Sequence, residues 1–131
     1  DLYRQFYNEP SNLKLARRFI GNNVRQQRST ILLALEKEGG ALGFAQLYPG
    51  WCSLAAAPLI TLYDLYVDKE ARQRGVARGL MAAAEKVAKK AKACRIDLET
   101  DTDNHQAQAL YEKLGYERDT AFYKYSLTLG D

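Results

Sequence analysis

Residues 72–79 combine positive charge with small side chains between a β-branched, aromatic run and an Ala-rich helical run. They read Arg-Gln-Arg-Gly-Val-Ala-Arg-Gly, so the small residues are Gly75, Ala77 and Gly79. Small residues let a ligand approach the backbone closely. The first N–H groups of a helix lack partners and lie at the positive end of its dipole. This combination predicts a seat for an anion, above all a phosphate or pyrophosphate.

The spacing excludes two common phosphate motifs. A Walker loop needs a Lys-Ser or Lys-Thr pair after its glycines, and none follows Gly75 or Gly79. Residues 75–79 also do not supply the Gly-x-Gly-x-x-Gly fingerprint of dinucleotide-binding proteins. The pattern that fits is Arg/Gln-x-x-Gly-x-Gly/Ala, with Arg72, Gly75 and Ala77 at its fixed positions.

A second motif lies over residues 104–116, Asn-His-Gln-Ala-Gln-Ala-Leu-Tyr-Glu-Lys-Leu-Gly-Tyr. It resembles the pattern Asn-x-x-Ala-x-x-Leu-Tyr-x-Lys-x-Gly-Phe/Tyr of the GNAT superfamily of N-acetyltransferases. The pattern at Arg72 is similar to the acyl-CoA pyrophosphate loop of the same superfamily. Both patterns occur in the expected order, and the resemblance covers roughly residues 31 to 129.

The resemblance implies acetyl-CoA as cofactor and an amine as acceptor. It assigns the pyrophosphate to backbone N–H groups of about Arg74 to Gly79, and the pantetheine arm to the backbone of the preceding strand. An alternative is that the glycines only shape the turn and the arginines are solvated. The implied cofactor-binding residues are Leu65, Tyr66, Val67, Arg72, Gln73, Arg74, Gly75, Val76, Ala77, Arg78, Gly79, Asn104, Ala107 and Tyr111.

Tyr111 is the catalytic side chain that the resemblance implies, because the tyrosine of this motif can return a proton to the CoA thiolate. A phenol with an ordinary pKa of about 10 is protonated at neutral pH. Asn104 would hydrogen-bond the cofactor arm, and it is equally suited to cap the helix. No cysteine lies in either motif, so direct attack of the amine is favoured over a covalent acetyl-enzyme.

The general base is less well indicated. Many family members carry Leu-Glu-Asp-Leu-Tyr-Val on the central strand, whereas residues 62–67 here read Leu-Tyr-Asp-Leu-Tyr-Val, so Tyr63 replaces the Glu. Asp64 is the remaining catalytic candidate, although strand alternation would direct it to the opposite face. It could instead bind a substrate cation, act through a water or be a hydrogen-bonded buried carboxylate. Other acidic groups near the expected cleft are Glu99, Asp101 and Asp103.

The elements that must position these residues predict a single α/β (α+β) domain over residues 1–131. We expect the GNAT fold, a central, mixed, mostly antiparallel twisted sheet flanked by helices. Members of the family usually open with a strand that leads into the first helix, whereas residues 1–7 already look helical, so that strand is absent, trimmed or replaced by another element. A second copy of the chain, forming a homodimer, is one candidate to cover the sheet edge that would be exposed. Helices are expected over 11–27, 74–93 and 104–114, strands over 31–36, 41–48, 59–67, 95–99 and 122–129, a turn at 38–40 and a loop over 49–58.

Composition excludes several other classes. The hydrophobic fraction of 47% predicts a folded chain, and the net charge of +3 is too small to imply nucleic acid. No apolar run approaches the ~20 residues that a membrane span requires. Cys52 and Cys94 fit no metal spacing or disulfide framework, and we expect two ordinary thiols in a reducing compartment, the cytoplasm. His105 is the lone histidine, and no metal site is expected.

The sequence therefore predicts a GNAT N-acetyltransferase whose acceptor is a small-molecule amine. The run over 62–67 is similar to that of diamine and polyamine acetyltransferases, which favours acceptors of that kind. One alternative is a GNAT-fold module that binds CoA without turnover. Another is a nucleotide-binding α/β protein, which ATP rather than CoA would stabilise.

Overall fold

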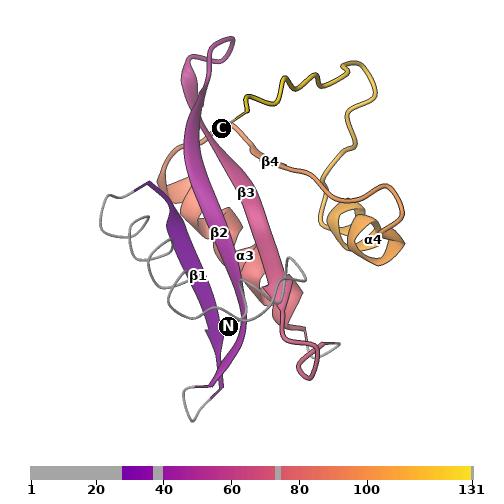
Figure 1. Ribbon diagram of the computed structural model, residues 1–131. Coiled ribbons are helices and arrows are strands. Elements are labelled where there is room, and N and C mark those ends of the chain that lie inside the picture. Colours follow the sequence, from indigo (N-terminus) through magenta and orange to yellow (C-terminus); the bar gives the residue numbers. More distant parts are fainter. Residues whose placement is uncertain (1–27, 37–39, 73–74, 131) are drawn as a thin grey trace. The chain divides into compact units, whose positions relative to one another are not determined.

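The computed structural model describes residues 28–36, 40–72 and 75–130. The chain divides into two compact units, residues 1–99 and 100–131. The first unit holds a four-stranded sheet in the order β1-β2-β3-β4, whose first three strands are antiparallel neighbours while β4 runs parallel to β3 (Figure 1). The mixed, mostly antiparallel sheet confirms the predicted fold class. Its strands are β1 (Thr30–Leu35), β2 (Ala41–Cys52), β3 (Ala57–Val67) and β4 (Ile96–Leu98).

The hairpin of β2 and β3 is longer than expected, so the predicted loop over 49–58 is wrong. β2 continues to Cys52, β3 begins at Ala57, and only residues 53–56 form the turn. Pro49 is tolerated inside β2 because the pairing of β1 with β2 ends at Leu47, and among the described residues only β3 pairs with β2 beyond that point. A strand with one open edge can lose an N–H donor there without losing a ladder bond.

A β-bulge interrupts the alternation of side chains along β3. Leu47 is paired with Leu62 and Gln46 with Asp64, so Tyr63 is the extra residue. Cross-strand partners share a face of the sheet. The bulge therefore changes which side chains of β3 point the same way.

Helix α3 (Val76–Lys90) packs against β1, β2 and β3. Its buried residues are Leu80, Met81, Ala84 and Ala88. Ala91 was expected on this face, but it follows the helix and is exposed, because the helix ends three residues earlier than its predicted end at Ala93. The helix approaches the sheet closely at Gly43, where a Cβ would lie 3.3 Å from Val76 Cγ1 and only 2.6 Å from the backbone oxygen of Tyr66.

The second unit contains α4 (His105–Lys113). Asn104 caps it, with Oδ1 accepting the Ala107 N–H at 3.1 Å. Gly115 ends it in the left-handed conformation, with φ of 97°. Both features confirm the predicted helix boundaries. Leu114 was expected in the core but is 38% exposed.

The final strand predicted over 122–129 is not formed. Phe122, Tyr123, Tyr125, Leu127 and Leu129 alternate with other residues in a segment that has no strand assignment, and all five are exposed. An alternating pattern favours an extended chain, but a strand also needs a hydrogen-bonded neighbour. No such neighbour pairs with this segment in the described part of the chain.

Several predictions concern residues outside the described ranges. These are the helix over 11–27, the helical start and missing first strand at 1–7, the turn residues Glu38 and Gly39, and the loop residues Gln73 and Arg74. No helix among the described residues is long and apolar enough to cross a membrane.

Candidate functional site

The turn after β3 is closed by Asp68. Its N–H donates to Leu42 O at 2.7 Å, which extends the ladder by one bond. Its Oδ1 accepts the Glu70 N–H at 2.9 Å, and its carbonyl accepts the Ala71 N–H at 2.8 Å. An Asp that bonds the backbone two residues ahead is a typical turn former. This turn directs the chain away from the sheet edge and toward the start of α3.

Helix α3 begins at Val76, two residues after the predicted start of the helix at residue 74. Gly75 is the N-cap residue, with φ of 77° and ψ of 10°, and no side chain caps the helix. The N–H of Gly79 donates to Gly75 O at 3.0 Å. The N–H groups of Val76, Ala77 and Arg78 precede this bond and have no acceptor within the helix. The first turn has no acidic residue, so these donors and the helix dipole favour an anion.

Both glycines of the predicted loop are open to solvent. A Cβ at Gly75 or Gly79 would meet no atom within 4 Å. At Gly75 the conformation itself requires glycine, because side chains rarely adopt this positive φ. At Gly79 neither conformation nor space requires glycine. An uncrowded backbone at both positions is what close approach of a ligand needs.

Arg72 is held beside the end of β3. Its Nε donates to Val67 O at 3.2 Å, and its guanidinium carbon lies 5.3 Å from the centre of the Tyr66 ring. A guanidinium over an aromatic face is a favourable cation–π arrangement. Arg72 therefore places positive charge next to the strand that was predicted to bind the pantetheine arm, and it already occupies the carbonyl of Val67.

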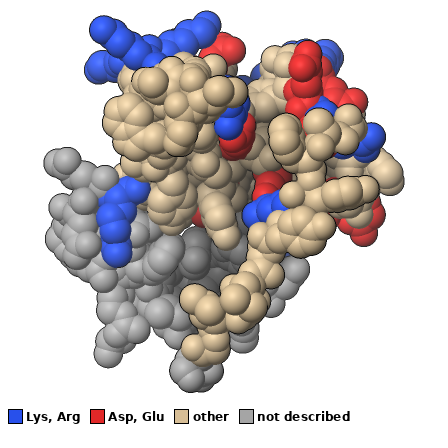
Figure 2. Space-filling model, turned by 90° about the horizontal axis from the view of Figure 1, so that it is seen from above, with Lys and Arg blue, Asp and Glu red and all other residues tan. Residues whose placement is uncertain are grey.

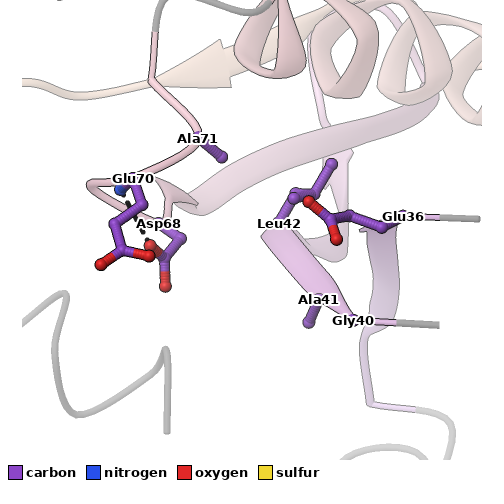
Figure 3. A pocket seen from close by; sticks show the side chains of 7 residues that line it. All are labelled: Glu36, Gly40, Ala41, Leu42, Asp68, Glu70 and Ala71. Carbon is purple, nitrogen blue, oxygen red and sulfur yellow. Dashed lines mark hydrogen bonds between the residues drawn. The ribbon is translucent and has the colours of Figure 1, made fainter. Parts of the chain in front are cut away.

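A pocket of about 250 Å³ lies where the end of β1, the start of β2 and the turn after β3 meet. Its acidic lining residues are Glu36, Asp68 and Glu70, with Asp68 and Glu70 side by side (Figure 3). Three carboxylates suit a cationic group and disfavour a phosphate. This pocket does not include Gly75 to Gly79, so it is separate from the predicted anion seat. Elsewhere on the surface, basic and acidic groups are both present on the face drawn in Figure 2.

Asp64 lies in a buried polar network. Asp64 is only 1% exposed, and its Oδ2 accepts a hydrogen bond from Gln46 Nε2 at 2.7 Å. Gln46 Oε1 in turn accepts from Ser29 Oγ at 2.9 Å. Burial of a carboxylate requires such partners. Of the alternatives for Asp64, the structure confirms that it is a hydrogen-bonded buried carboxylate.

The bulge places Asp64 and Tyr63 on the same face of the sheet. Asp64 pairs with Gln46, which shares a face with Tyr48 two residues on. The Tyr63 ring contacts Tyr48 edge to face, with centroids 5.7 Å apart. The expectation that Asp64 points opposite to residue 63 is therefore wrong, because the extra residue resets the alternation.

Tyr111 lies in the second unit on α4, as do the cap residue Asn104 and its partner Ala107. Tyr111 is 9% exposed, and burial raises the pKa of its phenol above the ordinary value of 10.0. A Schellman motif follows it, with the N–H of Tyr116 bonded to Tyr111 O and that of Gly115 to Glu112 O. The rings of Tyr111 and Tyr116 lie 6.0 Å apart, so the helix end orients the phenol.

Sequence reasoning missed Gln46 and Gly43. Gln46 is a buried amide in the otherwise apolar run over 42–47, and a polar residue in such a run was the available signal. No sequence signal marked Gly43, because the lack of room for a side chain there depends on the position of Tyr66 O in the neighbouring strand. The structure brings residues 65–67, Arg72 and the start of α3 together within the first unit. His105, as expected, is an exposed residue at the start of α4.

Comparison with known proteins agrees with this geometry. The family model of the acetyltransferase (GNAT) family matches residues 1–116. The uncharacterized N-acetyltransferase YhfO of Bacillus subtilis (strain 168) is 38% identical over 97% of this chain and 85% of its own length. The D-amino-acid N-acetyltransferase HPA3 of Saccharomyces cerevisiae is 36% identical over 70% of this chain and 58% of its own length.

Solved structures give the same result. The crystal structure of a protein described as a "probable acetyltransferase" superposes with a TM-score of 0.89 at 38% identity, covering 98% of this chain and 86% of the other. The match is to the whole fold, and the matched region contains both motifs. The chain therefore belongs to the GNAT family of N-acetyltransferases.

Proposed function

We propose that the protein transfers an acetyl group from acetyl-CoA to a primary amine, by direct attack of the amine on the thioester. The observation that carries this proposal is the start of α3. There, a left-handed Gly75 and three N–H groups without acceptors in the helix follow directly on the turn after β3.

The residues present fit the cofactor. Gly75 and Gly79 leave open space, and the first turn of α3 offers N–H donors with no acidic side chain among them. The backbone N–H groups of Val76, Ala77 and Arg78, which precede the first bond of the helix, would hold the diphosphate, with Arg72 and Arg78 adding positive charge. The backbone of residues 65–67 would hold the pantetheine arm. When bound, acetyl-CoA supplies the activated acetyl group.

Tyr111 is the proposed proton donor to the departing thiolate. Burial raises its pKa above 10.0, so the phenol stays protonated at neutral and mildly alkaline pH. Its orientation by the helix end supports a positioned donor rather than a loose surface side chain. General acid catalysis by a positioned group typically contributes about 100-fold or more to the rate.

Asp64 is the proposed acidic group for the amine, as base or as partner of its positive charge. It lies on the same face as Tyr63, which stands where many family members have Glu. Gln46 holds Oδ2, which would keep the carboxylate in one orientation. The replacement of that Glu by Tyr63 is also the observation that favours the second candidate, a module that binds CoA without turnover.

The proposed acceptor is a small amine of the diamine or polyamine kind, supported by the run over 62–67. A D-amino acid is a rival acceptor, because one relative carries that name. The cytoplasmic location and the homodimer both remain predictions from the sequence.

The test is to mix the protein with acetyl-CoA and a panel of diamines, polyamines, D- and L-amino acids and peptide N-termini. Release of CoA is measured by chromatography rather than with a thiol reagent, because such a reagent would also react with the two cysteine thiols of the protein. We expect release that depends on both the protein and one class of amine. Saturable CoA binding without turnover on any amine would instead support the binding module. Stabilisation by ATP and not by CoA would overturn both.

A further inference from the structure

A chain of side-chain hydrogen bonds crosses the three antiparallel strands of the sheet. It begins at Ser29, directly before β1, and runs through Gln46 in β2 to Asp64 in β3, and these strands lie side by side (Figure 1). Ser29 Oγ donates to Gln46 Oε1 at 2.9 Å, and Gln46 Nε2 donates to Asp64 Oδ2 at 2.7 Å. Strand pairing, rather than local sequence, therefore brings the three side chains together.

The register of the strands explains why Ser29 supplies the first donor. The partner of Gln46 across the β1–β2 pairing is Ile31, whose side chain forms no hydrogen bond. Ser29 lies two residues before Ile31 on the same side of the chain, and a long side chain reaches such a diagonal neighbour. Gln46 is also three residues from Gly43, which approaches Val76 of α3, so the bonds lie on the face of the sheet opposite α3.

The amide of Gln46 has one orientation that satisfies both of its ends. Gln46 is fully buried, and a buried amide needs a partner for its nitrogen and another for its oxygen. An ionised carboxylate only accepts hydrogen bonds, so Nε2 must point to Asp64 and Oε1 must point away from it. The Ser29 hydroxyl is the donor to Oε1. Ser29 thus fixes the amide, and the amide fixes the carboxylate.

We propose that Ser29 and Gln46 are positioning residues for acetyl transfer, which act by holding the Asp64 carboxylate in the orientation that serves the amine. This inference rests on the proposed function, in which Asp64 is the acidic group for the amine. Neither positioning residue is assigned a contact with the amine or with acetyl-CoA. Orientation matters for the rate because a misplacement of about 1 Å can slow a reaction about 100-fold.

The test measures kcat, KM and the Kd for CoA in variants of the full chain, with acetyl-CoA and the amine of the panel above that the wild type turns over fastest. Gln46→Leu keeps a similar volume without the amide, and its kcat should fall roughly 10- to 100-fold. Ser29→Ala removes only the donor to Oε1, and its kcat should fall roughly threefold. The Kd for CoA should not change in either variant, because the anion seat is at the start of α3.

Two hydroxyl variants serve as controls. Ser29→Thr keeps a hydroxyl at the same position, so it should restore most of the kcat that Ser29→Ala loses. Ser53→Ala removes an exposed hydroxyl from the β2–β3 turn, and it should leave kcat unchanged. Equal kcat in Ser29→Ala and the wild type would refute the role of Ser29, and this comparison remains available if Gln46→Leu does not fold.

A double-mutant cycle separates positioning from a merely structural role. If Gln46 acts through the carboxylate, Gln46→Leu should lower kcat in the wild type and cause no further loss in Asp64→Asn, which lacks the carboxylate. The same fold-loss in both backgrounds would show that Gln46 only supports the fold, and would overturn the inference. Unchanged kcat in Gln46→Leu, with kcat lowered in Asp64→Asn, would also overturn it and leave the proposed acetyl transfer standing.

An NMR measurement tests the same bonds without turnover. The side-chain N–H protons of Gln46 should exchange slowly with solvent in the wild type and at least about tenfold faster in Ser29→Ala, because the amide loses its anchor. Equal exchange rates would show that Ser29 does not fix the amide, and would overturn the inference. A wild type that turns over no amine would instead refute the proposed function, and this inference with it.

Discussion

Replacing Gly75 with Val tests the anion seat directly. Gly75 has φ of 77°, and a residue with a Cβ pays roughly 1–2 kcal/mol in this region. A Cβ at this position would meet no protein atom within 4 Å, so backbone strain is the main expected cost to folding. The methyl groups would instead fill the space through which an anion reaches the N–H groups of α3.

The expected loss of affinity follows from those hydrogen bonds. A hydrogen bond to a charged group contributes roughly 1.5–3 kcal/mol. Losing one would raise the Kd for CoA about 10- to 150-fold, since each 1.4 kcal/mol is a factor of ten. Calorimetric titration with CoA measures this change. Pantetheine, which lacks the diphosphate, should bind the variant and the wild type equally.

The matched control is Gly50→Ala. Gly50 lies in β2 outside the loop, and a Cβ there would be 3.9 Å from its nearest neighbours, an ordinary contact. This control should leave the Kd for CoA unchanged. If Gly75→Val remains folded by circular dichroism and urea unfolding, yet binds CoA with the wild-type Kd, the backbone around Gly75 does not hold the diphosphate.

Four further predictions concern catalysis and stability. Tyr111→Phe should lower kcat about 100-fold with unchanged Kd for CoA, and full activity in the variant would refute the donor role. Because burial raises the folded-state pKa of Tyr111, its contribution to the unfolding free energy is intact below pH 10.0 and declines as pH rises through the folded-state pKa. Urea unfolding of Tyr111→Phe as a function of pH should lack this decline. Gly43→Ala should lower the free energy of unfolding by about 1–3 kcal/mol, because the added Cβ would lie 2.6 Å from Tyr66 O. If urea unfolding shows that Gly43→Ala costs no more than the control Gly50→Ala, the close contact is contradicted. Asp64→Asn should lower kcat with the amine. Asp64→Leu should in addition lower the free energy of urea unfolding by about 1–3 kcal/mol, because it removes the acceptor of the Gln46 Nε2 hydrogen bond. Undiminished turnover in Asp64→Asn would limit the carboxylate to a structural role.

Most local features of the candidate site could be predicted from the sequence. The helix after the glycine loop, the Asn104 cap and the left-handed Gly115 were all predicted, because each depends on a few consecutive residues and their backbone preferences. The final strand over 122–129 was predicted on the same kind of signal and is wrong. Alternation along the chain says nothing about whether a hydrogen-bonding neighbour exists.

What the sequence determined by itself is therefore the set of local motifs and, through them, the family. The tertiary structure alone decided which face of β3 carries Asp64, since the bulge at Tyr63 appears only in the pairing with β2. It also decided that Arg95 contacts the Cys52 sulfur, because the pairing of β4 with β3 brings residues from distant parts of the chain to one sheet end. Such facts are properties of strand register, which hydrogen bonds between distant segments set and which no single segment contains.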